Sequence, residues 1–169
     1  MIKKKVCMLG AFAAGKTSLV QQYVHKIFSD KYHTTVGVNI EKIQVSSGDT
    51  AADLIIWDLH GEDDFQHVRL SYLTGSSGCV YVVDGTRRAT LATALGLKDI
   101  TEDTIGKVPC LIIINKADLK ESWEIDTAAV KDIKKQGINV IETSAKTGDN
   151  VEAAFKVLLN EMLGNKNGR

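Results

Sequence analysis

The chain is 169 residues long, the usual length of one domain, and 44% of it is apolar, which is enough for a sizeable core. Lysine plus arginine and aspartate plus glutamate each number 21, so the formal net charge is zero. A neutral chain has no long-range positive field to attract nucleic acid, and its apolar runs are far shorter than the roughly 18 residues of a membrane span. We therefore expect neither a nonspecific nucleic-acid binder nor a bilayer-spanning protein.

The three cysteines are far apart in the sequence, and each lies within an apolar run. This pattern favours buried free thiols in a reducing compartment over disulfides or zinc ligands for Cys7, Cys79 and Cys110. The amino terminus has no long apolar stretch of the signal-peptide type, and Ile2 occupies the position where N-myristoylation requires glycine. We therefore expect a cytoplasmic protein.

Short runs rich in valine and isoleucine alternate with longer stretches of helical period, which indicates a parallel sheet flanked by helices. The first predicted strand covers residues 5–9 and leads through a glycine-bounded loop into a helix with apolar residues at 19, 20, 23 and 24. Two strands follow at 38–45 and 52–58, and the polar stretch between them suits a hairpin. We therefore expect one antiparallel pair at the sheet edge.

The remaining strands are predicted at 78–84, 109–115 and 138–142, each after a helical segment, as parallel crossovers require. The last helix has the clearest apolar stripe, at 151, 154, 155, 158, 159 and 162, and Asp149 or Asn150 is its expected amino-terminal cap. These elements predict one α/β domain over residues 1–164, with a mostly parallel six-stranded sheet, one antiparallel edge strand and about five helices. Residues 165–169 are expected to form a disordered tail.

Residues 10–17 read GAFAAGKT and fit the pattern G-x-x-x-x-G-K-[ST] between a predicted strand and a predicted helix. Successive backbone N–H groups of such a loop point toward one place, and the helix amino terminus adds a positive dipole, so the place suits a phosphate. The Lys16 ammonium would lie between the β- and γ-phosphates, and the Thr17 hydroxyl is a hard oxygen ligand for Mg²⁺. The residues expected to hold the phosphates are Ala13, Ala14, Gly15, Lys16, Thr17 and Ser18.

A second motif, NKAD at 115–118, directly follows the apolar run 110–114. The carboxyl ends of parallel strands are where such sheets bind ligands. A carboxylate only accepts hydrogen bonds, so Asp118 pairs with the N1–H and N2–H₂ donors of guanine and is mismatched to adenine, whose N1 is an acceptor. The sequence therefore predicts GTP or GDP, rather than ATP, as the ligand.

Four motifs now stand in order: GAFAAGKT at 10–17, DLHG at 58–61, NKAD at 115–118 and TSAK at 143–146. In order and spacing they resemble the small GTPases of the Ras superfamily over essentially the whole chain. The sequence is most similar to the Rab branch, because Thr35 begins a TVG triplet before the second strand, Trp57 precedes DLHG, and Tyr72 follows it. The resemblance implies the small G domain, a fold of the P-loop nucleotide hydrolases.

The resemblance also implies roles around the phosphates. Thr35 would bind Mg²⁺ through its hydroxyl and the γ-phosphate through its backbone, and Asp58 would be the second magnesium-site residue, acting through water. The Gly61 N–H would contact the γ-phosphate. Loss of that phosphate would release two segments, 26–37 and 59–73, and so make the protein a binary switch.

Around the base, the resemblance implies that Phe28 packs edge-on against guanine and that the stems of Lys116 and Lys146 lie along its two faces. The Ala145 N–H would donate to guanine O6. The base-binding residues are then expected to be Phe28, Asn115, Lys116, Asp118, Ser144, Ala145 and Lys146.

Protein partners are expected at the switch segments, on a surface formed by Ile40, Trp57 and Tyr72. An ordinary role in the core is an equal alternative for the two aromatic residues. Rab-like proteins usually end in prenylated cysteines, and the sequence as given has no cysteine after Cys110. Either the given sequence stops before such a tail, or the protein works as a soluble switch that a partner holds in place. We expect a monomer that is either free in the cytoplasm or held at a membrane surface by a partner.

Two positions differ from the family pattern where hydrolysis takes place. Phe12 stands where the family usually has a small residue, and its ring could either obstruct the catalytic water or close the site to bulk water. Glu62 stands where the family typically has a water-orienting glutamine, and an ionised carboxylate beside phosphate costs Coulomb energy and cannot donate. We expect slow hydrolysis; in an alternative, Glu62 has a raised pKa or swings out, and His60 or a partner residue orients the water. The expected catalytic residues are Lys16, Thr35, Gly61 and Glu62.

Two other functions fit parts of the sequence. A non-catalytic nucleotide-binding module, locked in one state, would explain Phe12 and Glu62 directly. A P-loop kinase would need an arginine-rich lid, but the only adjacent arginine pair, Arg87 and Arg88, follows a predicted strand and is better explained as a solvated helix start.

Overall fold

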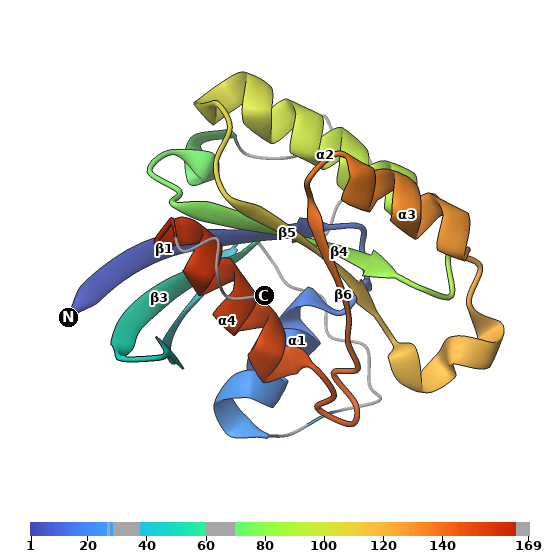
Figure 1. Cartoon of the computed structure of the whole chain (residues 1–169), viewed down its shortest axis with the longest axis horizontal. Helices are drawn as coiled ribbons and strands as arrows, with labels where there is room; N and C mark the ends of the chain where they lie inside the picture. The colour runs from blue at the N-terminus through green and yellow to red at the C-terminus, as the bar shows by residue number, and fades with distance from the viewer. Residues whose placement is uncertain (27, 29–37, 60–69, 165–169) are drawn as a thin grey trace.

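The computed structural model describes residues 1–26, 28, 38–59 and 70–164, which form a six-stranded sheet with helices on both faces (Figure 1). The strands are β1 (Ile2–Gly10), β2 (Val38–Ser47), β3 (Thr50–Leu59), β4 (Gly78–Asp84), β5 (Cys110–Asn115) and β6 (Asn139–Glu142). They lie in the order β2-β3-β1-β4-β5-β6, and only the β2–β3 pair is antiparallel. The predicted α/β architecture is confirmed.

The edge hairpin and the first strand are longer than predicted. The hairpin is tight, since Ser47 pairs with Thr50 and Gly48 takes a positive φ of 60° in the turn between them. β1 begins at Ile2, three residues before the predicted start, because Ile2 pairs with Ala52 at the extended end of β3. Pairing with β3 therefore extends β1 into the lysine-rich start of the chain.

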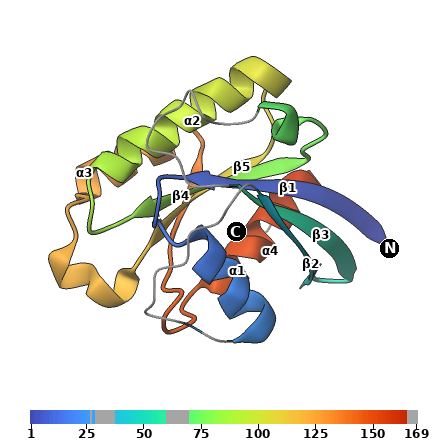
Figure 2. The same cartoon turned by 180° about the vertical axis from the view of Figure 1, so that it is seen from behind.

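The described residues include the α-helices α1 (Lys16–His25), α2 (Ala89–Ile105), α3 (Thr127–Lys135) and α4 (Val151–Met162), and the 3-10 helices η2 (Leu70–Leu73) and η3 (Ala117–Ser122). Figures 1 and 2 show α1 and α4 on one face of the sheet and α2 and α3 on the other. The expected side-chain cap of the last helix is absent from the described contacts: Asn150 is at the cap position with a φ of 59°, and its amide donates to the Glu142 carbonyl instead.

Each face of the sheet has its own core. Val6 and Met8 of β1 point into one cluster with Phe155 of α4, whereas Cys7 and Leu9 point into the other. Cys7 and Cys79 are buried free thiols, as predicted, and burial raises the pKa of Cys79 to about 12. Cys110 is only half-buried, because it stands at the first position of β5.

Polar or small residues lie at or next to the carboxyl ends of the central strands: Gly10 on β1, Asp58 on β3, Asp84 on β4 and Asn115 on β5. Asp58, Asp84 and Asn115 are all buried. A buried carboxylate or amide is costly unless it has partners, so this edge is where the fold concentrates its polar contacts.

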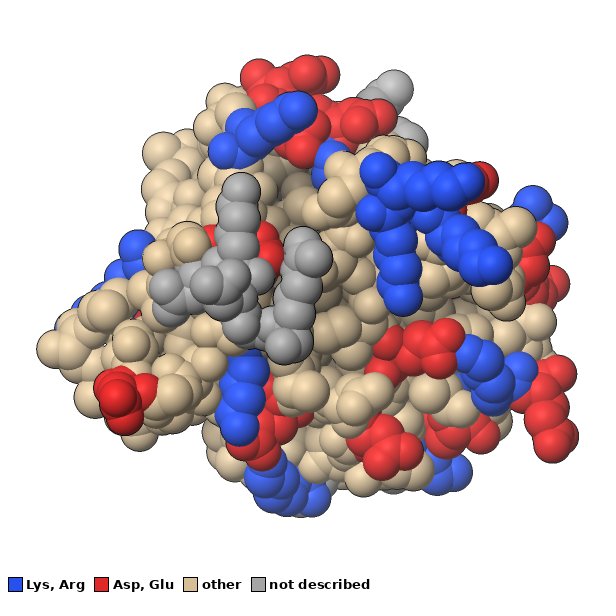
Figure 3. All heavy atoms as spheres, viewed as in Figure 1, with Lys and Arg blue, Asp and Glu red and all other residues tan. Residues whose placement is uncertain are grey.

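Acidic and basic side chains are interspersed over the face drawn in Figure 3, in keeping with a net charge of zero. Among the described residues, no helix is both long enough and apolar enough to cross a membrane.

Candidate nucleotide site

The loop between β1 and α1 has two positions that only glycine can occupy. A Cβ on Gly10 would lie 2.4 Å from the Val82 carbonyl oxygen, and a Cβ on Gly15 would lie 2.1 Å from Nδ2 of Asn115. Gly15 also has a φ of 106°, in the left-handed region that favours glycine. The two glycines of the GAFAAGKT motif therefore allow the loop to lie directly against the ends of β4 and β5.

The amino terminus of α1 opens from this loop. Gly15 is the cap residue, so no side chain caps the helix within the described part of the chain, and no acidic residue lies in the first turn. The first N–H groups of a helix have no intrahelical partner and carry the positive end of its dipole. This is the arrangement that binds a phosphate or another anion.

Lys16 is the first residue of the helix and is only 5% exposed. Its ammonium donates to the carbonyl oxygens of Gly10 and Ala11, at 3.1 and 3.0 Å. The lysine therefore stretches back along the loop and places a buried positive charge within it. A buried ammonium favours a nearby anion, because burial penalises charge that has no counter-charge.

Thr17 and Asp58 meet beside the loop, as the magnesium prediction requires. The Thr17 hydroxyl donates to Oδ2 of Asp58 at 2.5 Å. Asp58 Oδ1 is buried and has no hydrogen-bond partner among the described residues. Burial raises the pKa of Asp58, and the hydrogen bond from Thr17 and the charge of Lys16 offset only part of this rise. A hydroxyl and an unsatisfied buried carboxylate oxygen are hard ligands that fit Mg²⁺.

Asn115 joins the phosphate loop to the loop after β6. Its Nδ2 donates to the Ala14 carbonyl at 3.2 Å, and its Oδ1 accepts from Thr143 Oγ1 and from Ala145 N, each at 3.1 Å. One side chain thus connects two segments that are 28 or more residues away in sequence. In this structure, the contacts of Asn115 hold the two loops together.

Asp118 lies on η3 and is exposed, as a base-recognising carboxylate must be. Its Oδ1 accepts from the Ser144 hydroxyl at 2.7 Å, and Thr147 N donates to the same hydroxyl at 3.1 Å. No described residue donates to Asp118 Oδ2. The Ala145 N–H, which we expected to bind guanine O6, donates to Asn115 in this structure.

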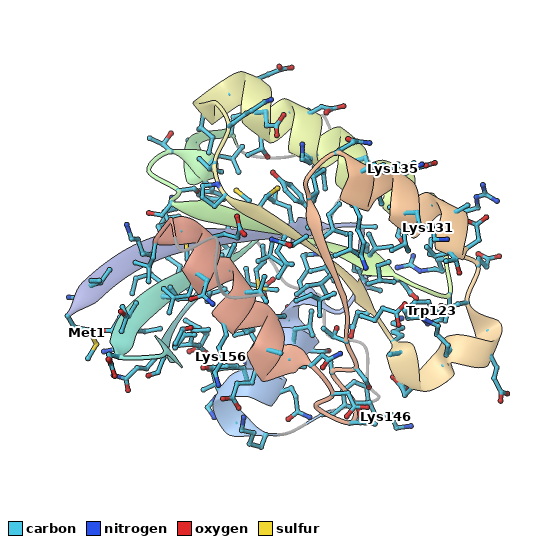
Figure 4. The ribbon with its side chains drawn as sticks, viewed as in Figure 1. Met1, Trp123, Lys131, Lys135, Lys146 and Lys156 are labelled. Carbon is cyan, nitrogen blue, oxygen red and sulfur yellow. The ribbon has the colours of Figure 1, made fainter. Side chains whose placement is uncertain are left out.

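The backbone of Lys116 takes a left-handed conformation with a φ of 74°, which a residue other than glycine adopts only when its surroundings hold it there. Trp123 Nε1 donates to its carbonyl at 2.8 Å, and the Lys116 ammonium pairs with Asp84 Oδ2 at 2.7 Å. Figure 4 shows Trp123 beside η3 and Lys146 on the loop that precedes α4. The Lys116 stem is thus held at both ends.

Two functional contacts were missed by sequence reasoning. Asp84 is buried at the end of β4, and the pattern that identified Asp118, a carboxylate at the carboxyl end of a buried strand, could have found it. Arg87 and Arg88 were expected to form a solvated helix start, and Arg88 is the exposed cap residue of α2. Arg87 does more than this prediction allows, because it pairs with Asp84 and donates to the Phe12 carbonyl. That contact joins residues 75 apart in sequence, which no local pattern indicates.

The expected partner surface is continuous in the structure. Ile40 pairs with Trp57 across the β2–β3 hairpin and is 50% exposed. The rings of Trp57 and Tyr72 have centroids 5.9 Å apart, and the Lys5 ammonium lies 3.7 Å from the centroid of Trp57. Both aromatic residues are half-buried against the core that underlies α2. Each ring therefore packs on the core, as the alternative interpretation predicts, and keeps part of its surface exposed, while a role in binding partners stays a prediction.

Several predicted residues lie outside the described part of the chain: Thr35, His60, Gly61 and Glu62. Among the others, Phe28 is 40% exposed, and Lys146 is also exposed.

Comparison with known proteins adds to this geometry. A model described as the Ras family matches residues 5–164. The chain belongs to the Ras family. It is 33% identical to "Ras-related protein Rab-1" of Theileria parva over 157 residues, which cover 91% of this chain and 71% of that protein. It is also 33% identical to "Ras-related protein Rab-7b" of Homo sapiens over 166 residues, covering 94% of this chain and 82% of that protein. The chain is therefore a Rab-like, GTP-binding small GTPase, and its sheet and helices are those of a small G domain.

Proposed function

We propose that the polar edge of the sheet binds GDP and GTP with Mg²⁺ and hydrolyses GTP slowly. The observation that carries the proposal is the Asn115 side chain, which holds the phosphate loop and the TSAK loop side by side through Ala14, Thr143 and Ala145. The same contacts would keep a phosphate site and a purine-base site at one fixed separation. The G domain proposed here covers residues 1–164.

On the phosphate side, the backbone N–H groups of Ala13, Ala14 and Gly15 and the amino terminus of α1 would surround the β-phosphate. The Lys16 ammonium lies in this loop on the carbonyl oxygens of Gly10 and Ala11, and it would turn to the β- and γ-phosphate oxygens. Thr17 and Ser18 would complete the contacts at the start of the helix.

Thr17 and Asp58 would hold Mg²⁺, together with Thr35 from the segment before β2. The fit rests on the Thr17 hydroxyl beside the carboxylate and on the unsatisfied Oδ1 of Asp58. When bound, the ion would neutralise charge on the phosphate oxygens. Burial raises the pKa of Asp58, which means that its ionised form lacks sufficient stabilisation in the protein alone. A divalent cation beside the carboxylate would supply that stabilisation.

On the base side, Asp118 would accept the two guanine donors, oriented by its hydrogen bond from Ser144. The stems of Lys116 and Lys146 would cover the faces of the base, with Phe28 at its edge. Asn115 would act mainly by holding these loops, and Ala145 would contribute through its place in the TSAK loop.

Slow hydrolysis is proposed from residue chemistry. Glu62 would stand beside the γ-phosphate with the Gly61 N–H and the Lys16 ammonium, and an ionised carboxylate there repels phosphate and cannot donate to it. Phe12 adds bulk at the same place. The residues proposed to act on the transferring phosphoryl group are Lys16, Thr35, Gly61 and Glu62.

The proposed consequence of hydrolysis is a change of partner affinity at the surface formed by Ile40, Trp57 and Tyr72. Ile40 and Trp57 flank the two segments proposed to respond to the γ-phosphate, 26–37 and 59–73, and Tyr72 lies within the second. We propose that the protein acts as a monomer in the cytoplasm or at a membrane surface through a partner.

The test is single-turnover hydrolysis of GTP preloaded on the purified protein with Mg²⁺, followed by chromatography of the bound nucleotide over hours. Conversion to GDP supports the proposed slow switch. Bound GTP that persists unchanged refutes hydrolysis and leaves the non-catalytic binding module. Failure of the wild-type chain to retain any guanine nucleotide, with Lys16→Ala as the matched loading control, would refute the proposed site itself.

A further inference from the structure

Arg87 links the phosphate loop to the end of β4. Its Nη2 donates to the Phe12 carbonyl oxygen at 2.5 Å, and its Nε donates to Asp84 Oδ2 at 3.0 Å. Two different nitrogens of one planar guanidinium thus bind two different elements at once, whereas an ammonium would have to reach both acceptors from a single nitrogen.

Asp84 extends this link to the base side of the site. Its side chain is 1% exposed, and its Oδ2 also accepts from the Lys116 ammonium at 2.7 Å. Thr86 fixes the other oxygen, Oδ1, through its N–H at 2.9 Å and its hydroxyl at 2.7 Å. All the hydrogen bonds reach an ionised, buried acceptor, so they are of the charge-assisted kind.

The contacts form one path from Phe12 through Arg87 and Asp84 to Lys116. Phe12 belongs to the loop proposed to hold the phosphates, and Lys116 belongs to the motif proposed to hold the base. Asn115 provides one connection between these two parts, on the side of Ala14, and the Arg87 path provides a second one through different atoms. The phosphate loop is therefore held by hydrogen bonds at two carbonyl groups, those of Phe12 and Ala14, which are two residues apart.

We propose that Arg87 is a positioning residue for guanine nucleotide: it holds the phosphate loop through the Phe12 carbonyl and couples that loop to Lys116 through Asp84. This inference rests on the proposed function, because it assigns the ends of the path to the two parts of the nucleotide site. We therefore expect this path to slow nucleotide release. When the phosphates or the base detach, the path keeps both loops in their binding geometry, so that the nucleotide can bind again before it leaves.

Arg88 offers a matched control at the next position. It carries the same charge and is exposed, and its guanidinium makes no hydrogen bond or ion pair with the described residues. Its backbone N–H donates to Glu124 and its carbonyl oxygen accepts from Leu91, and both bonds survive a change of side chain. Arg88→Ala therefore removes one positive charge near the same helix start without breaking the path.

The experiment measures the release of fluorescent N-methylanthraniloyl-GDP from the preloaded protein, with excess unlabelled GDP, in Mg²⁺. The labelled GDP should leave the Arg87→Ala variant about fivefold faster than it leaves wild type. Loss of a fully buried charged hydrogen bond would have a larger effect, but the Arg87 side chain is 42% exposed, so solvent weakens its contacts. Arg88→Ala should stay within about twofold of wild type, because exposed charges contribute little.

Two further variants separate positioning from general stability. Arg87→Lys can keep the ion pair with Asp84 but cannot also reach the Phe12 carbonyl, so we expect a wild-type melting temperature with release still faster than wild type. Asp84→Asn should accelerate release by itself, and adding it to Arg87→Ala should increase the rate by a smaller factor than it does in wild type, because both act on one path.

The inference is overturned if Arg87→Ala releases nucleotide at the wild-type rate, if Arg88→Ala accelerates release equally, or if the Arg87 and Asp84 effects multiply independently. These outcomes differ from a failure of the proposed function. If the wild-type chain retains no labelled GDP, the nucleotide site is refuted, and the coupling with it.

Discussion

Asn115→Ala tests the central connection of the site. The substitution removes three hydrogen bonds and leaves the Ala14 carbonyl, the Thr143 hydroxyl and the Ala145 N–H, all buried, without their partner. Each buried group left unsatisfied costs about 1–3 kcal/mol, and local rearrangement recovers part of this. We expect the free energy of unfolding to fall by about 3 kcal/mol.

The assay is urea unfolding followed by circular dichroism, with nucleotide removed by EDTA and repeated at saturating GDP. Asn150→Ala is the matched control, because its amide makes one exposed hydrogen bond, to the Glu142 carbonyl, and the residue has a positive φ. That control should cost about 1 kcal/mol. GDP binding should also stabilise Asn115→Ala less than it stabilises wild type, because linkage scales with affinity. Equal losses for the two variants would refute the assigned role of Asn115.

Three other predictions concern charge and chemistry. Glu62→Gln and Phe12→Gly should each accelerate single-turnover GTP hydrolysis, because one restores a donor amide and the other removes bulk; slower or unchanged rates for both would contradict the account of slow turnover. Asp118→Asn should lower the preference for GDP over xanthosine diphosphate in competition binding, because an amide can donate to the xanthine 2-oxygen; an unchanged preference would remove Asp118 from base recognition. Burial alone raises the pKa of Asp84, but hydrogen bonds from Lys116, Thr86 and Arg87 outweigh it, so the net pKa lies below 3.8. The stability that Asp84 contributes is therefore present above pH 3.8 and is lost as pH falls through its folded pKa, and the difference between wild type and Asp84→Asn in urea unfolding should narrow over that range.

Part of the fold could be predicted because it depends on local pattern. Five of the six strands both begin and end within two residues of their prediction, since runs of valine and isoleucine bounded by glycine or polar residues identify buried strands. The start of β1 differs because pairing with β3, rather than its own lysine-rich sequence, extends it to Ile2.

The nucleotide-binding motifs could also be predicted because they depend on local sequence. Each is a short contiguous segment whose chemistry is complete in itself: a glycine loop before a lysine and a hydroxyl, or a carboxylate just after a buried strand. Asp118 and Thr17 were found in this way, and the structure places their loops at one edge of the sheet.

The sequence by itself thus determined the order of strands and helices and the two kinds of chemistry, phosphate binding and guanine recognition. Only the tertiary structure decided how these parts are connected. Asn115 reaches Ala14 across 101 residues, and Arg87 reaches Phe12 across 75. The physical reason is that a hydrogen bond to a backbone carbonyl depends on where the fold brings that carbonyl and not on which residue carries it. Such contacts leave no pattern in the sequence, and they are the ones that hold the site together.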